Sequence, residues 1–222
     1  MNTNLGLIGK KLGNTQIFTE DGSVLRVTAI QTGPCVVVGK RTQDKDGYSA
    51  LRIGFGTRGA KHVRRPQSAE YEKLGVEAPA IVRELRLPAE QVATYTVGQT
   101  LAASDIFTEG HFVDVAGKSK GRGFTGVMRR HNFSGAGTVG HGTHEYKRHG
   151  GSIGQNMTPG RTFKGMGMPG QHGAKRVSVQ NLRIAKILPE ENIVLVEGGV
   201  PGAPQGLVLV RHAVKKPAKT EN

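Results

Sequence analysis

A 60-residue segment, Gly117–Arg176 (the basic segment), carries most of the net charge of this chain and almost nothing that could form a core. It contains eleven lysines and arginines against one acid, Glu145, so it contributes +10 of the chain's +14. It also holds 16 of the 33 glycines, no leucine, and only Val127, Val139 and Ile153 as branched aliphatic residues. Because so little apolar surface cannot offset the entropy lost on ordering, we expect this segment to be disordered alone and to fold against a polyanion.

The rest of the chain has the composition of an ordinary folded domain. Outside the basic segment, 20 basic residues (31 minus 11) face 16 acids (17 minus 1), so the charge is nearly balanced. A chain of 222 residues with 36% hydrophobic content can form a core in part of its length. This division, with an isoelectric point near 10.2, indicates a globular body with one arm for nucleic acid or another anionic surface. A membrane is the weaker partner, because glycines interrupt any amphipathic helical period.

The cysteine count and the N-terminus bear on the compartment. The single cysteine, Cys35, excludes an internal disulfide and fits a reducing compartment. It precedes three valines, so we interpret it as a buried strand residue. Met1–Gly13 has the pattern of neither a signal peptide nor an anchor, and no stretch approaches the roughly 18 apolar residues of a membrane span. We therefore expect a cytoplasmic protein.

The sequence on both sides of the basic segment has the pattern of β-strands. Asp21-Gly22 supplies the positive φ angles that a tight hairpin needs, and strand follows strand without helical spacing. This predicts a mostly β fold: a closed antiparallel β-barrel body with a small α/β insertion at about residues 60–93, and a long, irregular Gly/basic extension. One helix is expected at Ser68–Leu74. The expected strands are Thr15–Thr19, Ser23–Gln31, Cys35–Lys40, Tyr48–Phe55, Ile81–Leu87, Thr96–Leu101, His111–Val115, Val177–Leu188, Asn192–Glu197 and Leu207–Arg211.

Because strands resume after the basic segment, we interpret that segment as an excursion from one domain, anchored at both ends. The predicted body spans residues 1–116 and 177–214, and the predicted extension spans residues 117–176. A polar tail at residues 215–222 is expected to be disordered. The core candidates of the last third are Val177, Val179, Leu182, Ile184 and Ile187.

Two glycine motifs raise the alternative of a nucleotide-binding enzyme. Gly121–Gly126 matches G-x-G-x-x-G and follows a predicted strand. That fingerprint should open a hydrophobic helix, but here Val127 is followed by charged residues and further glycines. Gly117-Lys118-Ser119 resembles the end of a phosphate-binding loop, but Phe112 occupies a position that requires glycine. Because both matches fail, we expect these glycines to have a role other than nucleotide binding.

A group of histidines raises the question of a metal site. His131, His141, His144 and His149 could together bind zinc. However, no cysteine is nearby, Glu145 is the one carboxylate of the segment, and the neighbouring cations would repel a metal ion. The same shortage of titratable partners argues against general acid-base catalysis. We therefore predict no catalytic residue, no cofactor and no metal site.

The basic segment has the residue types that bind folded RNA. Lysine and arginine neutralise phosphates, and glycine lets backbone amides approach the RNA closely. Interleaved aromatic side chains can stack on bases, and arginine adds bidentate phosphate contacts. The predicted RNA-binding residues are Lys118, Lys120, Arg122, Phe124, Arg129, Arg130, His131, Lys147, Arg148, Gln155, Asn156, Arg161, Lys164, Lys175 and Arg176.

Short motifs that contain glycine, basic residues or both occur over most of the chain. They are Gly6–Gly13, Lys118–Val127, Arg129–His131, Gly151–Asn156, Thr158–Arg161, Phe163–Gly165 and Val200–Gly202. Together they resemble the family of the third protein of the large ribosomal subunit, in its bacterial form. The resemblance weakens over Ala60–Ala93 and in the tail.

The resemblance implies a β-barrel body at the subunit surface and an extension that threads through 23S rRNA. The tip of the extension would be the turn at Gly154–Thr158, approaching the peptidyl transferase centre. The family also implies binding early in subunit assembly, contacts with neighbouring ribosomal proteins, and stabilisation of the catalytic RNA. It implies no chemistry, no small-molecule substrate and no membrane partner.

Two positions depart from the family pattern. Met157 stands where some bacterial relatives carry a methylated glutamine, so that modification cannot occur here. Asn14 replaces the methionine usual after Gly13, which can alter local packing without changing the function. A free-standing RNA chaperone shares the composition and stays an alternative, but it would not need both ends of the extension fixed in a folded body.

Overall fold

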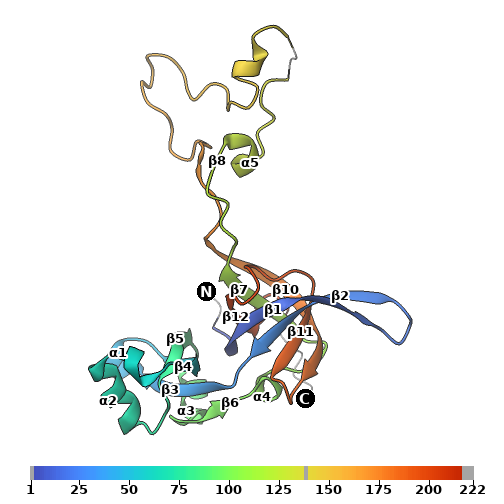
Figure 1. The fold of residues 1–222 in the computed structure, drawn as a ribbon. Coiled ribbons are helices and arrows are strands. Elements are labelled where there is room, and N and C mark those ends of the chain that lie inside the picture. Colours follow the sequence, from blue (N-terminus) through green and yellow to red (C-terminus); the bar gives the residue numbers. More distant parts are fainter. Residues whose placement is uncertain (1–2, 138–139, 217–222) are drawn as a thin grey trace. The chain divides into compact units, whose positions relative to one another are not determined.

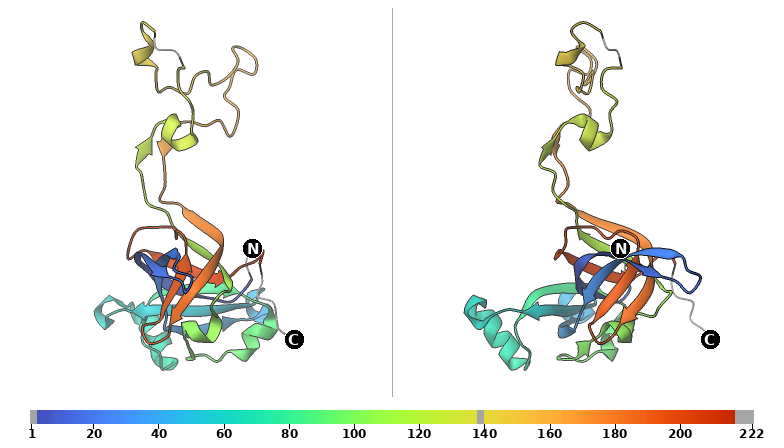
Figure 2. Two further views of the ribbon diagram at one scale, coloured as in Figure 1. Left: turned by 90° about the vertical axis from the view of Figure 1, so that its right-hand side faces the viewer. Right: turned by 45° about the vertical axis from the view of Figure 1, so that its right-hand side comes forward.

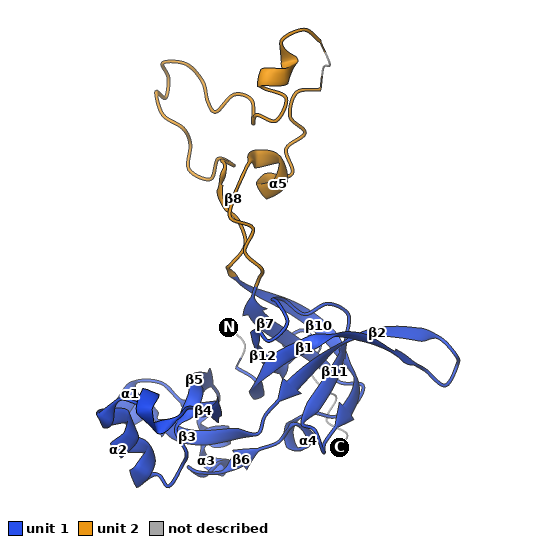
Figure 3. Ribbon diagram, in the orientation of Figure 1, with its two compact units in different colours: residues 1–118, 176–222 blue, residues 119–175 orange. Residues whose placement is uncertain are grey.

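The computed structural model describes residues 3–137 and 140–216 (Figure 1). It divides into two compact units: residues 119–175, the smaller unit, and the chain on both sides of them, the larger unit (Figure 3). The prediction made for residues 217–222 of the tail falls outside the described residues. In the described part, no helix is both long and apolar enough to cross a membrane.

Six antiparallel strands of the larger unit form a closed ring (Figure 2). Each is hydrogen-bonded to two neighbours, in the order β1, β12, β7, β10, β11, β2 and back to β1. Buried branched residues alternate along the strands and fill the ring; Val115, for example, lies opposite Val210 and both are fully buried. The strands are β1 (Gly6–Phe18), β2 (Val24–Thr32), β7 (Phe112–Lys118), β10 (Arg176–Leu188), β11 (Ile193–Glu197) and β12 (Leu207–His212).

A second sheet of four strands, in the order β5-β4-β3-β6, belongs to the same unit. Its buried side chains, such as Leu51 and Ile53, share one hydrophobic cluster with Ile8 and Ile30 of the ring. The elements are β3 (Cys35–Arg41), α1 (Gln43–Asp46), β4 (Ala50–Thr57), the 3₁₀ turn η1 (Ala60–His62), α2 (Arg65–Lys73), β5 (Pro79–Arg86), α3 (Ala89–Thr94), β6 (Thr100–Leu101) and α4 (Ala103–Ile106).

The prediction of a mostly β chain is confirmed. The turn of the hairpin of β1 and β2 forms as expected, with Gly22 at φ 75°, but β1 begins at Gly6 and not at the expected Thr15. Cys35 is fully buried at the start of β3, where its thiol donates to the carbonyl oxygen of Ile8 at 3.4 Å. Burial raises the pKa of this thiol to about 11. Cys35 is thus a core residue, as its sequence context indicates.

Several expected elements differ in the structure. β3 and β4, expected as part of the closed body, belong to the separate sheet, and the chain that connects them contains α1, which was not expected. The expected helix at Ser68–Leu74 begins earlier, at Arg65, because Pro66 suits the first turn of a helix. The expected strand Thr96–Leu101 shrinks to two residues, since Gln99 N bonds back to Thr96 O in a turn.

Two of the five core candidates on β10 lie outside the hydrophobic core, and Leu182 and Ile187 are only partly buried against it. Ile184 is fully buried, but Val177 is 42% exposed and Val179 is only half-buried. Val177 lies opposite Gly117, which has no side chain to cover it. The pattern of apolar residues along a strand indicates which face points inward. It does not reveal which residue of the neighbouring strand lies opposite each position.

The smaller unit contains little regular structure. Its elements are β8 (Phe124–Thr125), α5 (Val127–His131), the 3₁₀ turn η2 (Thr143–Glu145) and β9 (Gly170–Gln171). Val127 is the one buried hydrophobic residue among its described residues. Loops with glycines at positive φ connect these elements.

Candidate nucleic-acid interface

The smaller unit begins and ends in a two-stranded stem. Ser119 N donates to Lys175 O and Arg122 N donates to His172 O, both at 2.9 Å. β8 and β9 continue the same antiparallel pairing. The stem therefore brings together predicted RNA-binding residues that lie more than 50 positions apart in the chain, such as Arg122 and Lys175.

Some glycines of this unit permit close packing within the chain. Gly173 has φ 73°, and a Cβ there would overlap the carbonyl oxygen of Lys120 on the other stem strand. At Gly135, with φ 74°, a Cβ would overlap the carbonyl oxygen of Lys147. The sequence predicts that the glycines let the backbone approach RNA closely. At these two positions the structure gives them a second reason, which depends on contacts between distant residues and is invisible in composition.

The last residues of α5 are held against a distant loop. Arg130 Nη1 donates to Met168 O at 2.5 Å, and His131 Nε2 lies 3.0 Å from the same oxygen. Because a carbonyl oxygen only accepts, Nε2 of His131 carries its proton. A Cβ on Gly170 would come within 2.7 Å of Arg130 Nη1, so this glycine leaves room for the guanidinium. The fold thus fixes Arg130, while its neighbour Arg129 is exposed.

A small apolar contact also supports α5. A Cβ on Gly150 would touch both Phe133 and Val127 at 3.4 Å, so the loop backbone packs directly on these side chains. The ring of Phe133 also lies 6.0 Å from that of His131. These contacts are too few for a core of the usual kind. They orient the end of α5 without burying it.

The predicted RNA-binding residues are accessible and unpaired by acids. Fourteen of the fifteen are exposed, and Arg130 is half-buried. The four ion pairs among the described residues all lie in the larger unit, and none involves a predicted RNA-binding residue. Loss of hydration lowers the pKa of His172 below 6.5, and the charges of Arg122 and Arg129 lower it further. The smaller unit therefore presents positive charge that no acid of the described chain neutralises.

Large apolar side chains are exposed beside these cations. Seven of the twelve exposed large hydrophobic residues of the described chain belong to the smaller unit. Rings and thioethers at the surface can stack on bases or pack on sugars. The seven are Phe124, Tyr146, Ile153, Met157, Phe163, Met166 and Met168.

The structure gives the G-x-G-x-x-G match no dinucleotide-binding context. The helix that follows Gly126 has five residues, and β8 before it pairs antiparallel with β9. A dinucleotide fold places the motif between parallel strands, at the start of a longer helix. Within residues 3–137 and 140–216, no group of three or more His, Cys, Asp or Glu side chains could hold a metal ion.

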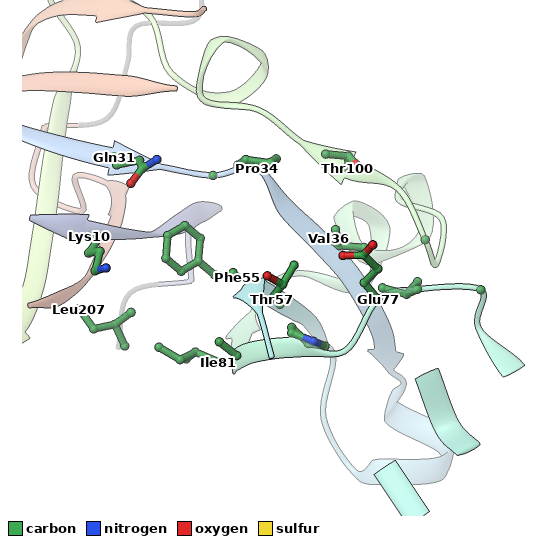
Figure 4. Close-up of a pocket in the computed structure, with 18 of the residues that line it drawn as sticks. Lys10, Gln31, Pro34, Val36, Phe55, Thr57, Glu77, Ile81, Thr100 and Leu207 are labelled. Carbon is green, nitrogen blue, oxygen red and sulfur yellow. The ribbon is translucent and has the colours of Figure 1, made fainter. Parts of the chain in front are cut away.

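A groove of about 780 Å³ lies in the larger unit between the ring and the second sheet (Figure 4). Apolar side chains such as Phe55, Ile81 and Leu207 line it, together with several glycines. Its ionisable residues are Lys10 and Glu77, which Figure 4 shows on different sides. The lining contains no histidine, cysteine or serine.

Comparison with known proteins agrees with the motifs of the sequence. Residues 42–192 match the family model described as ribosomal protein L3. A protein of Sorangium cellulosum named large ribosomal subunit protein uL3 is 56% identical over 97% of this chain and 92% of its own length. Proteins of the same name from Brachyspira hyodysenteriae and Acidothermus cellulolyticus are 44% and 48% identical, over 98% and 97% of this chain and 98% and 96% of their own lengths.

Proposed function

Since the chain belongs to the ribosomal protein L3 family, we propose that it uses the basic segment to bind 23S rRNA as a structural constituent of the large ribosomal subunit. The observation that carries this proposal is the set of exposed cations in the smaller unit, which no acid of the described chain neutralises. Phosphates are the counterions that would complete it.

In this proposal the two units have different tasks. The ring of six strands is the β-barrel body at the subunit surface, and residues 117–176 form the extension that penetrates the RNA. The turn at Gly154–Thr158 is the tip that stabilises RNA near the peptidyl transferase centre. Binding occurs early in subunit assembly, in the cytoplasm, and neighbouring large-subunit proteins are further partners. The protein performs no chemistry itself.

The proposal is tested by the salt dependence of binding to purified large-subunit rRNA. If about six of the eleven basic side chains meet phosphates, the log-log slope of affinity against salt should be roughly −4 to −5. A slope near zero would exclude phosphate contacts as the basis of binding and would refute the proposal.

A pair of variants locates the contacts. Replacing Arg129 and Arg130 with alanine should reduce the steepness of this slope by about 1.4–1.8, since each lost phosphate contact contributes roughly 0.7–0.9. The matched control is Arg64→Ala with Arg65→Ala, an adjacent and exposed arginine pair of the larger unit. Equal losses from both pairs would show that binding follows net charge rather than the proposed extension.

A further inference from the structure

A second cationic site lies in the larger unit, on the outer face of the ring. Arg211 of β12 lies opposite Asp114 of β7, and Arg176 of β10 lies opposite Lys118 of β7. Directly paired residues of neighbouring strands point to the same side of a sheet, as do alternate residues along one strand. Val115 of β7 is fully buried inside the ring. Asp114 and Lys118 have the opposite orientation along β7, so they and their paired arginines lie on the outer face of the ring.

Small residues form the floor between these cations. Ala116 of β7 lies opposite both Ser178 of β10 and Leu209 of β12. Alanine and serine end close to the backbone, whereas the flanking arginines extend well beyond it. The result is a depression of about 330 Å³, whose lining includes Arg176, Arg211 and Lys215.

The charges around this depression favour an anion. The one acid in the lining, Asp114, is buried and accepts hydrogen bonds from two backbone amides, Asn181 N at 3.0 Å and Val214 N at 3.2 Å. The lining therefore contains three cationic side chains and one carboxylate, which leaves a net positive charge. Burial lowers the pKa of the Arg211 guanidinium, and the charge of Arg176 lowers it further, as expected for cations held near one another.

We propose that this depression, formed by Arg176, Arg211, Lys215 and Ser178, binds a phosphate group of an RNA backbone. The guanidiniums supply planar donors that suit phosphate oxygens, and the Ser178 hydroxyl can donate one further hydrogen bond. The site rests on the proposed RNA-binding function and extends it from the smaller unit to the outer face of the ring. Arg211, Lys215 and Ser178 were not among the residues predicted from the sequence, because they lie outside the basic segment.

The site is tested in the full-length chain with Arg211→Gln combined with Lys215→Gln. The matched control is Arg26→Gln with Lys186→Gln, which removes one arginine and one lysine from exposed positions on other parts of the ring. The wild-type salt slope on large-subunit rRNA should fall in steepness by about 1 in the site variant and remain unchanged in the control. Ser178→Glu, which places an acid on the exposed floor, should reproduce the loss while keeping every cation.

Inorganic phosphate serves as a second probe, with the backbone amide signals of Ser178 and Lys215 followed by NMR. These signals should shift saturably in the wild type and the control, and should not shift in the site variant. If phosphate shifts them but the RNA slope is the same in site and control variants, the site is a free-anion site and the RNA assignment is overturned. If neither probe separates the variants, the site itself is refuted.

These outcomes separate the site from the proposed function as a whole. A wild-type chain that binds rRNA without any salt slope contradicts the proposed function. A normal wild-type slope, unchanged in both Arg211→Gln/Lys215→Gln and Ser178→Glu, contradicts only the outer-face site. Thermal unfolding of each variant, compared with the wild type, identifies any loss that arises from misfolding.

Discussion

The larger and the smaller unit differ in how many of their apolar side chains are buried and in how many of their charged side chains are paired. The larger unit contains 27 of the 28 buried hydrophobic residues of the described chain, and all four of its ion pairs. The smaller unit contains one buried hydrophobic residue and seven of the twelve large hydrophobic residues that are exposed. The larger unit buries many apolar side chains and pairs several of its charges, whereas the smaller unit presents most of both to solvent.

This difference indicates where the stability of each unit comes from. In the larger unit, burial of branched and aromatic side chains can offset the entropy of ordering. In the smaller unit, order comes from backbone hydrogen bonds of the stem, glycines that permit close approach, and a few contacts such as that of Arg130 with Met168 O. Such contacts define a conformation but contribute little free energy, so we expect RNA binding to supply the rest.

The largest effect is expected in a comparison of two phenylalanines, one in each unit. Phe107 is 1% exposed in the shared core, whereas Phe124 on the stem is 78% exposed. Phe107→Ala should lower the free energy of unfolding of the larger unit by about 3–5 kcal/mol, because it removes buried surface and leaves a cavity. Phe124→Ala should change it by less than about 0.5 kcal/mol. Chemical denaturation followed by far-ultraviolet circular dichroism measures both.

In RNA binding, Phe124→Ala should have a larger effect than Phe107→Ala. Phe124→Ala should weaken binding to large-subunit rRNA, since base stacking on an aromatic ring contributes about 1–3 kcal/mol. If Phe124→Ala instead destabilises the free protein as much as Phe107→Ala does, the smaller unit has a core of its own and the contrast between the units is wrong.

A smaller effect is expected from a glycine of the stem. Gly173→Ala places a Cβ against the Lys120 carbonyl at φ 73°, and left-handed backbone costs a non-glycine residue about 1–2 kcal/mol even without the overlap. If the bound form needs this stem, affinity for rRNA should fall by roughly 5–30-fold. Unfolding of the larger unit should not change.

Gly126→Ala is the matched control, because nothing lies within 4 Å of a Cβ at that position and its φ is −68°. It should bind rRNA within about threefold of the wild type, as expected for a change of a few tenths of a kcal/mol. Normal affinity of Gly173→Ala would mean that the stem opens on binding.

The sequence predicts the larger unit better than the smaller one, for a physical reason. Short strand-like runs without helical spacing revealed most strands of the ring, and Asp21-Gly22 revealed the first hairpin, because both are local signals. Which sheet β3 and β4 join depends on pairing between distant segments, and alternation carries no information about it.

For the candidate RNA-binding site, too, the sequence predicts local features and misses long-range contacts. Charge and composition identified the basic segment and its accessible cations, since these are sums over the sequence. They could not reveal that Gly173 packs on Lys120, that Arg130 bonds to Met168 O, or that Arg211 lies beside Arg176. Each of these depends on a long-range contact that only the folded chain creates.

The smallest expected effect concerns the pH dependence of the larger unit. His212 of β12 packs against the ring of Phe107 with centroids 5.2 Å apart. Burial lowers the pKa of His212 below its ordinary value of 6.5, a hydrogen bond with the backbone of Ile106 opposes this, and His111 adds to the lowering. Because these contributions partly cancel, the net effect on stability is modest.

The sign of this effect follows from proton binding in the two states. The unfolded chain binds a proton at His212 more readily than the folded chain does, so stability is fully present above pH 6.5 and is lost as pH falls through that value toward the lowered pKa. The free energy of unfolding should therefore decrease between pH 7.5 and 5.5, and His212→Gln should reduce that decrease. An equal decrease in the variant would assign the pH dependence to groups other than His212.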